Sequence, residues 1–161
     1  MPTATAQKYF DEAELLTENN HYSEAVEAYK KAVEADPAFI SAYYNLAVIY
    51  HRTQQFYYAI TCLKKAIELD AGDASAFNNL GVLYFTISVF DEAKKYFEKS
   101  LSIEPDYKEA KNNLEKVQLK LQMIQAQSFK RSAGAGSNNK RLKIGFVSIW
   151  FERGQSYVTK T

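Results

Sequence analysis

The chain has 161 residues, of which 47% are hydrophobic and 24% are charged, and its formal net charge is +1. This length accommodates one domain with a short extension. The sequence contains no apolar run of about 18 residues and no basic-then-apolar leader pattern, so we expect neither a membrane partner nor secretion. The single cysteine, Cys62, cannot form an internal disulfide, which favours the reducing environment of the cytoplasm.

The charge is divided unevenly along the chain. Residues 1–126 contain 13 Lys and Arg against 18 Asp and Glu, whereas residues 127–161 contain 7 against 1. A basic segment of this kind is usually solvated. Nucleic-acid binding is the sharper alternative, but the basic residues are scattered and no recognised nucleic-acid motif accompanies them. We therefore expect no nucleic-acid partner.

Three segments of the chain align at a period of 34 residues. The octapeptide that begins at Tyr43 matches the one that begins at Phe77 in its aromatic residue, its Asn, its Leu, its small residue and its Tyr. Further positions recur with the same period, namely Ala25, Ala59 and Ala93, then Tyr29, Leu63 and Phe97, then Ala32, Ala66 and Ser100. Repeats of this length stack on their neighbours, bury one continuous core and leave an open face.

Each repeat has the pattern of two amphipathic helices. In the first repeat, apolar residues between Leu15 and Val33 recur at steps of three and four, which is the spacing of one helix face. Polar residues at 19–21 mark the turn between the two helices. Pro37 and Pro105 stand between repeats, where proline ends one helix and fits the first turn of the next. Small residues at repeated positions predict close helix crossings.

This repeated pattern of aromatic, Leu, small residue, Tyr, Ala and Pro resembles the tetratricopeptide repeat. The resemblance covers three copies, at residues 6–39, 40–73 and 74–107, and residues 108–126 resemble the polar helix that caps such arrays. It implies an all-α fold over residues 1–126, a right-handed superhelix of antiparallel helix pairs. It also implies a protein-interaction module with a concave groove.

Beyond residue 126 the pattern changes. Residues 127–141 contain a small, polar stretch rich in Gly and Ser and are expected to form a flexible linker. Residues 142–151 are rich in β-branched and aromatic residues, which predicts an isolated strand at the start of the segment 142–161. The exposed edge of such a strand could pair with a second copy of the chain and form a homodimer through residues 142–151.

The same C-terminal residues carry a second resemblance. The segment from Lys143 to Ser148, followed by Trp150 and Phe151 and then by Tyr157, looks like the first strand and loop of nucleotide-sugar glycosyltransferases with two Rossmann-like domains. Tetratricopeptide arrays are found fused ahead of such enzymes, including the protein O-linked N-acetylglucosamine transferases. Those transferases have a His just after the strand, and this chain does not. The resemblance implies an alternative, in which the chain is the N-terminal piece of a glycosyltransferase and recruits the acceptor protein.

No catalytic constellation is visible, and we expect this chain to have no enzymatic activity, cofactor or metal site. His21 and His51 fall at helix-end turns in different repeats, without a Cys or carboxylate cluster at metal-ligand spacing. Cys62 lies between apolar positions of a helix, where it is expected to act as a small buried hydrophobe.

The candidate binding residues are expected on the open face. Asn45, Asn79 and Asn113 are 34 residues apart and would form a ladder whose amides can pair with the N–H and C=O groups of an extended peptide. The alternative is that these side chains only brace neighbouring helices. The complete predicted groove set is Tyr44, Asn45, Val48, Asn78, Asn79, Val82, Phe85 and Asn113. Its mixture of apolar and amide groups predicts an apolar or neutral peptide or partner segment.

Some tetratricopeptide proteins grip a C-terminal carboxylate with Lys and Arg of this surface. The corresponding positions in this chain are expected to be Phe10, Glu14, Ser41, Asn45, Ser75 and Asn79. Because none of these is cationic, an adaptor for chaperone C-terminal tails is disfavoured. The sequence predicts a scaffold that binds an extended peptide or partner segment.

Overall fold

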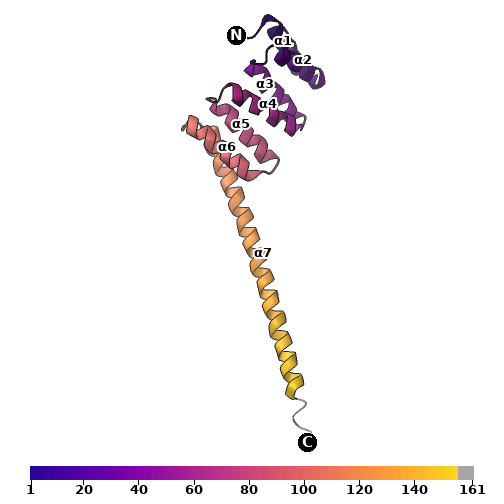
Figure 1. Cartoon of the computed structure of the whole chain (residues 1–161), viewed down its shortest axis with the longest axis vertical. Coiled ribbons are helices and arrows are strands. Elements are labelled where there is room, and N and C mark those ends of the chain that lie inside the picture. The colour runs from indigo at the N-terminus through magenta and orange to yellow at the C-terminus, as the bar shows by residue number, and fades with distance from the viewer. Residues whose placement is uncertain (156–161) are drawn as a thin grey trace. The chain divides into compact units, whose positions relative to one another are not determined.

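The computed structural model describes the backbone of residues 1–155 and the side chains of residues 1–132. Within residues 1–155 the chain forms seven helices and no strand (Figure 1). The helices are α1 (Ala4–Glu18), α2 (Tyr22–Ala35), α3 (Ile40–Arg52), α4 (Phe56–Leu69), α5 (Ala74–Thr86), α6 (Phe90–Ile103) and α7 (Lys108–Gln155). The predicted all-α class is confirmed. One compact unit comprises Met1–Gln118, and a second begins at Leu119.

Three helix pairs, α1 with α2, α3 with α4 and α5 with α6, make up the first unit together with the start of α7 (Figure 1). In the turn of each pair one residue adopts the left-handed conformation, Asn20 at φ 61°, Gln54 at φ 60° and Ser88 at φ 64°. The N–H of the following residue then closes the turn, as from Gln55 to the Tyr50 carbonyl at 2.7 Å. These three residues are also 34 apart. The same turn conformation therefore recurs in every repeat, although none of the three residues is glycine.

The core of the helix pairs combines small residues, aromatic rings and aliphatic side chains. Ala25, Ala59 and Ala93 are each 0% exposed, which confirms the predicted close crossings. At Gly81 the approach is closest, because a Cβ added there would lie 2.6 Å from the ring of Phe97, which is itself 1% exposed. The packed face therefore leaves no room for a larger side chain at this position.

Neighbouring repeats are joined at equivalent positions by different chemistry. Between the first and second repeats, the rings of Phe10 and Phe39 pack with centroids 4.8 Å apart. One period later the equivalent residues are Tyr44 and Asp73, and the Tyr44 hydroxyl donates a hydrogen bond to the Asp73 carboxylate. The same carboxylate accepts backbone N–H bonds of 2.8 and 3.2 Å from the first turn of α5. Asp73 thus caps α5 and ties it to α3.

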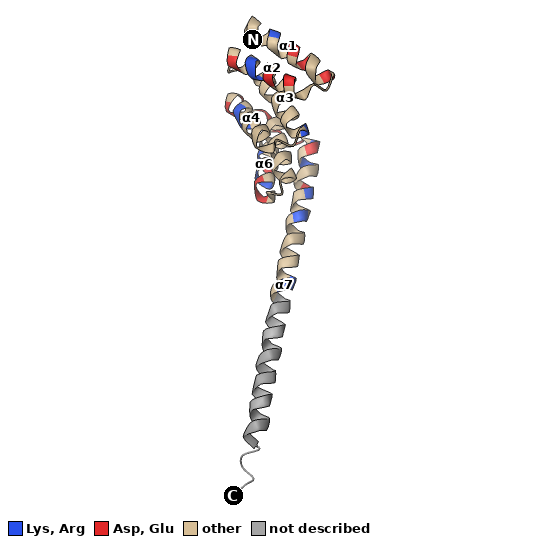
Figure 2. Ribbon diagram, turned by 90° about the vertical axis from the view of Figure 1, so that its right-hand side faces the viewer, with Lys and Arg blue, Asp and Glu red and all other residues tan. Residues whose placement is uncertain are grey.

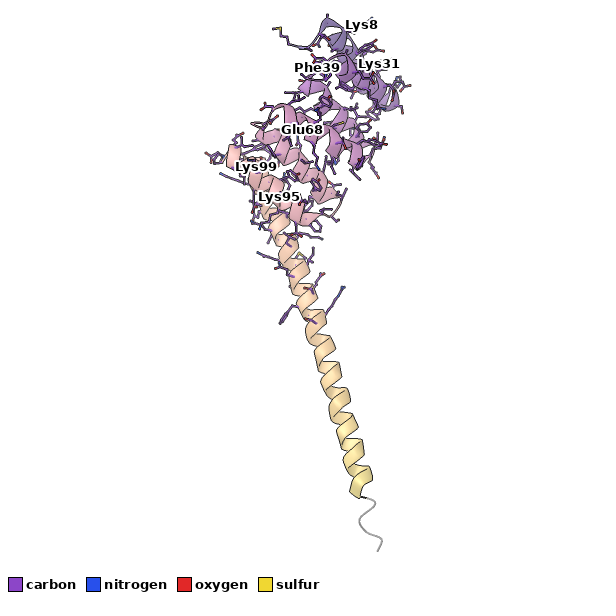
Figure 3. All side chains as sticks on the ribbon, viewed as in Figure 1. Lys8, Lys31, Phe39, Glu68, Lys95 and Lys99 are labelled. Carbon is purple, nitrogen blue, oxygen red and sulfur yellow. The ribbon has the colours of Figure 1, made fainter. Side chains whose placement is uncertain are left out.

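The charged residues of the helix pairs are unevenly distributed. Charges of both signs are mixed along α2 and α6 (Figure 2), whereas α3 and α5 contain no Asp, Glu or Lys. Lys31 and Lys99 lie over the rings of Tyr9 and Phe77 at 5.7 and 5.9 Å, and both lysines are labelled in Figure 3. Lys31 and Lys99 therefore have ring neighbours, and α5 together with α3 up to Tyr50 supplies a surface without charged side chains.

The helix α7 departs from the sequence prediction. Its first turns pack on the array, and Ala110 and Val117 are 0% exposed. The helix then continues to Gln155, whereas a linker is predicted at 127–141 and a strand at 142–151. A lone strand has no partner for its backbone N–H and C=O groups, while a helix satisfies these groups internally.

The predicted homodimer depends on the exposed edge of a strand at residues 142–151. The backbone of these residues is helical and offers no such edge. The side chains of residues 142–151 lie outside the described residues, and so does all of 156–161, the last part of the predicted segment 142–161. The glycosyltransferase-like strand is not supported, because the backbone of its residues is helical.

Candidate functional site

An apolar recess lies between α3 and α5. Its lining consists of Tyr44, Ala47, Val48, His51, Leu63, Asn79, Val82 and Leu83. Its volume is about 140 Å³, close to the roughly 150 Å³ of an engineered apolar cavity that holds benzene. One aromatic or branched aliphatic side chain from a partner would fill this space. Val48 on its wall is 54% exposed, so the recess presents apolar surface to solvent.

A second, acidic recess lies between α1 and α3. Its lining consists of Glu14, Thr17, Glu18, Tyr29, Asn45, Val48 and Ile49. Glu14 and Glu18 are exposed and stand one helical turn apart on α1. Val48 belongs to both linings, so the two recesses are adjacent.

Two tyrosine hydroxyls beside these recesses are held in the neutral state. Burial raises the pKa of Tyr29, which is 1% exposed, and the hydrogen bond from Asn45 partly opposes this. Burial is also the main reason why the pKa of Tyr44 lies far above its ordinary value, and the bond to Asp73 raises it further. Near neutral pH both hydroxyls can therefore donate and accept hydrogen bonds.

The three Asn residues of the predicted ladder differ in their surroundings. The Asn45 Nδ2 donates to the Tyr29 hydroxyl at 3.0 Å, and the Asn113 Nδ2 donates to the Asn78 Oδ1 at 3.0 Å. Asn79 is exposed and lines the apolar recess. Two of the three amides therefore brace neighbouring helices, and Asn79 is the member of the ladder at the apolar recess.

Five of the eight predicted groove residues line the recesses, namely Tyr44, Asn45, Val48, Asn79 and Val82. The other three do not. Asn78 is only 5% exposed and bonds Asn113, so both belong to the seam between α5 and α7. Asn78 is 34 residues after Tyr44, whose hydroxyl bonds to Asp73 across the contact between the second and third repeats. Asn78 holds the equivalent position at the next contact, which explains why its side chain is buried. Phe85 packs edge-on against Phe90, with ring centroids 5.3 Å apart.

Several residues of the recesses are absent from the predicted groove set. They are Ala47, His51, Leu63 and Leu83 in the apolar recess and Glu14, Thr17, Glu18, Tyr29 and Ile49 in the acidic one. The repeat period contains a signal for one of them, because Glu14 is one period before Val48 and two periods before Val82. For the buried lining residues, the helical spacing of apolar positions predicts only that they belong to the core. It does not indicate that they line a recess.

Cys62 is 8% exposed, and burial raises the pKa of its thiol to about 11, so the thiol stays protonated near neutral pH. No group of three or more His, Cys, Asp and Glu is arranged to hold a metal ion among the described residues. No helix among these residues combines the length and apolar character that crossing a membrane requires.

Comparison with known protein families gives two matches. A family model described as TPR repeat matches residues 13–54, and one described as Tetratricopeptide repeat matches residues 39–105. No curated protein matches the chain significantly. These family matches end well before the last 20 residues, so the glycosyltransferase resemblance gains no support from them.

Solved structures share the fold of the helix pairs. The first TPR of Spaghetti (RPAP3), bound to the HSP90 peptide SRMEEVD, is 29% identical over 73% of this chain and 93% of that chain, with a TM-score of 0.67. The second TPR domain of human RPAP3, in complex with the HSP70 peptide SGPTIEEVD, is 29% identical over 71% and 95%, with a TM-score of 0.65. The Sgt2 TPR domain from Aspergillus fumigatus, at 24% identity over 78% and 84%, has a TM-score of 0.69 and shows the fold alone. Residues 13–105 of this chain therefore contain tetratricopeptide repeats, and the helix pairs have the fold of solved TPR domains.

Proposed function

We propose that the chain is a non-enzymatic interaction module whose open face binds an extended segment of a partner protein. The observation that carries this proposal is the apolar recess between α3 and α5, where Val48 is 54% exposed. A concave apolar lining with a few polar groups is the usual character of a binding site. The two RPAP3 structures contain peptides, SRMEEVD and SGPTIEEVD, which supports a ligand of the same kind.

In this proposal, one apolar side chain of the peptide enters the apolar recess and the peptide backbone contacts Asn79. Burial of one such side chain contributes about 1.5–3 kcal/mol. A neutral hydrogen bond from the Asn79 amide contributes about 0.5–1.5 kcal/mol. The apolar contact is therefore expected to supply the larger share of the affinity.

The proposed ligand differs from the acidic peptides of the RPAP3 structures. At positions where carboxylate-gripping relatives are expected to carry Lys and Arg, this chain has Phe10 and Glu14 on α1. Phe10 packs against Tyr29 and Phe39, and Glu14 would repel a carboxylate. We therefore propose a neutral or apolar segment without an acidic C-terminus.

The compartment proposed for this module is the cytoplasm. Cys62 is a free and buried thiol within the described residues. Its role as a small core side chain needs no second cysteine and fits a reducing environment.

Selection of random linear dodecapeptides from a phage-displayed library on the full chain tests the proposal. We expect enriched peptides with at least one Leu, Ile, Phe or Met. Substitution Val48→Ser should weaken the selected peptides roughly fivefold, about 1 kcal/mol, because apolar contact area is lost. The matched control is Val89→Ser, which alters a 41% exposed valine outside both recesses.

Two outcomes would contradict peptide binding by this face. One is selection of no peptide above the level found on an albumin-coated surface. The other is an equal loss of affinity in the Val48→Ser and Val89→Ser variants, since the effect would then have no connection with the recess.

A further inference from the structure

Equivalent positions of the open face differ in charge between repeats. Glu14, Val48 and Val82 follow one another at the 34-residue period and line the two recesses. Glu18 adds a second carboxylate to the acidic recess, and no Lys or Arg belongs to either lining within the described residues. The face therefore joins an acidic end at α1 to an uncharged, apolar end between α3 and α5.

We propose that this face selects peptides that carry Arg or Lys two or three residues away from an apolar residue. The inference rests on the proposed function, because it specifies the ligand of the same face. The apolar side chain fills the apolar recess, and the basic side chain enters the acidic recess, where Glu14 and Glu18 accept its hydrogen bonds.

The expected spacing follows from the packing of the helices. The two recesses lie on opposite sides of α3 and share Val48. Packed helices lie about 8–10 Å apart, so the centres of the recesses should be separated by a similar length. An extended peptide advances about 3.3 Å per residue, so two or three residues span this separation.

The two carboxylates of the acidic recess are free to accept a basic side chain. Glu27, Glu68, Glu92 and Glu98 each form an ion pair with a lysine on the same helix. Glu14 and Glu18 form no such pair within residues 1–132, although both are exposed. A guanidinium group presents its N–H donors in a planar fork, which suits two carboxylates one helical turn apart.

The neighbouring apolar surface suits the stem of the same peptide residue. Val48 lies in the lining with the carboxylates and offers an apolar surface for the methylene groups of Arg or Lys, whereas the donors of Thr17 and Asn45 are bonded to Ala13 and Tyr29. A C-terminal carboxylate in the same place would meet two negative charges, so acidic tails are selected against.

The experiment is a second analysis of the dodecapeptides selected on the full chain. The expected result is enrichment of Arg or Lys at two or three positions from Leu, Ile, Phe or Met. The double variant Glu14→Gln/Glu18→Gln should bind such a peptide about three- to tenfold more weakly, the sum expected of two exposed ion pairs. The Arg→Ala analogue of the peptide should bind both proteins equally.

The matched control is Glu12→Gln, an exposed carboxylate on α1 outside the acidic recess. It removes one negative charge from the same helix and should leave the affinity unchanged. A charge reversal, Glu18→Lys, should favour acidic peptides and improve binding of SGPTIEEVD relative to the unmodified chain. Melting curves recorded for every variant identify any loss of affinity that comes from unfolding.

The outcomes separate this inference from the proposed function. Enrichment of apolar residues without Arg or Lys, or unchanged affinity in the double variant, would overturn the charge preference and leave peptide binding intact. Selection of no peptide at all would overturn both. Strong binding of SGPTIEEVD, which contains no Arg or Lys, by the unmodified chain would also contradict the preference for basic residues.

Discussion

The packed face and the open face of the repeats obey different constraints. On the packed face, Ala25, Ala59 and Ala93 are identical and 0% exposed in all three repeats. On the open face, Glu14 in the first repeat occupies the position of Val48 in the second. Every repeat must stack on its neighbour through the same geometry, so the packed face repeats its residues. The open face has no neighbour to fit, and its residues can differ with the ligand.

The contacts between neighbouring repeats, the seams, are intermediate between these two faces in how strictly their residues repeat. Phe10 and Phe39 form an aromatic contact, whereas the equivalent Tyr44 and Asp73 form a hydrogen bond. Both solutions fill the same place in the stack, but only the second has a directional, polar requirement. The seam chemistry can thus vary as long as the volume is filled and the polar groups are paired.

The largest predicted effect contrasts two adjacent residues of α5. Substitution Gly81→Val should lower the free energy of unfolding by about 1–3 kcal/mol, because the new side chain meets the Phe97 ring. Substitution Val82→Ala, on the open face, should lower it by less than about 1 kcal/mol. Chemical denaturation of both variants measures the difference. Equal losses would show that the two faces are not distinct in packing.

The next contrast concerns the seam. Substitution Tyr44→Phe removes the hydroxyl that donates to Asp73 and should lower the free energy of unfolding by about 1–2 kcal/mol. The control is Tyr43→Phe, since the Tyr43 hydroxyl forms only an exposed bond of 3.3 Å to the Pro37 carbonyl. Thermal melts compare the two variants, and a larger loss in Tyr43→Phe would exclude the bond to Asp73 as the stronger link.

The pH dependence of stability provides another test of the seam. Burial and then Asp73 raise the pKa of Tyr44 in the folded state above its unfolded value of about 10. Its contribution is therefore complete below that pH and is lost as the pH rises above it. Denaturation at a series of alkaline pH values should show a decline in stability that is less steep in Tyr44→Phe. The same slope in both proteins would assign the decline to other tyrosines.

A smaller effect separates the members of the Asn ladder. Substitution Asn45→Ala or Asn113→Ala should each lower the free energy of unfolding by about 0.5–1.5 kcal/mol, because a bracing bond is lost. Substitution Asn79→Ala should leave the melting temperature nearly unchanged and weaken a selected peptide. Melting curves and peptide titrations of the three variants measure these effects. Unfolding of the Asn79→Ala variant would show that Asn79 also braces neighbouring helices.

The smallest predicted effect is a gain of stability in the turns. Gln54 and Ser88 hold left-handed conformations that glycine adopts without strain. Substitutions Gln54→Gly and Ser88→Gly should each raise the free energy of unfolding by at most about 1 kcal/mol. Asn20→Gly should give no gain, because Asn tolerates this conformation and its Oδ1 accepts a hydrogen bond from the Tyr22 hydroxyl. Destabilisation by Gln54→Gly and Ser88→Gly as well would contradict the expected relief of strain.

The apolar neighbours of Cys62 indicate its place in the core, where it is buried. Val48, Asn79 and Val82 line the apolar recess, and their role as binding residues stays a prediction. The sequence period was sufficient to predict the packed face, with Ala59 at a helix crossing. It could not identify Asn78 as buried, because two adjacent amides look alike in sequence and only the helix rotation separates them.

The prediction failed at residues 127–155 for a different reason. Local β propensity favoured a strand at 142–151, but a strand also needs partners to which its backbone can bond. The acidic recess was missed because Glu14 was compared only with cationic clamp positions. Its equivalence to Val48 by the 34-residue period contained the missing signal.

Amide chemical-shift mapping with a selected peptide is the measurement that tests the central claim most directly. The peptide is added to the isotope-labelled full chain, and the shifts of assigned backbone amides are followed to saturation. We predict that the largest changes occur at Val48, Asn79 and Val82, with smaller changes at Glu14 and Glu18. Changes confined to the charged surfaces of α2 and α6 would contradict binding in the recesses.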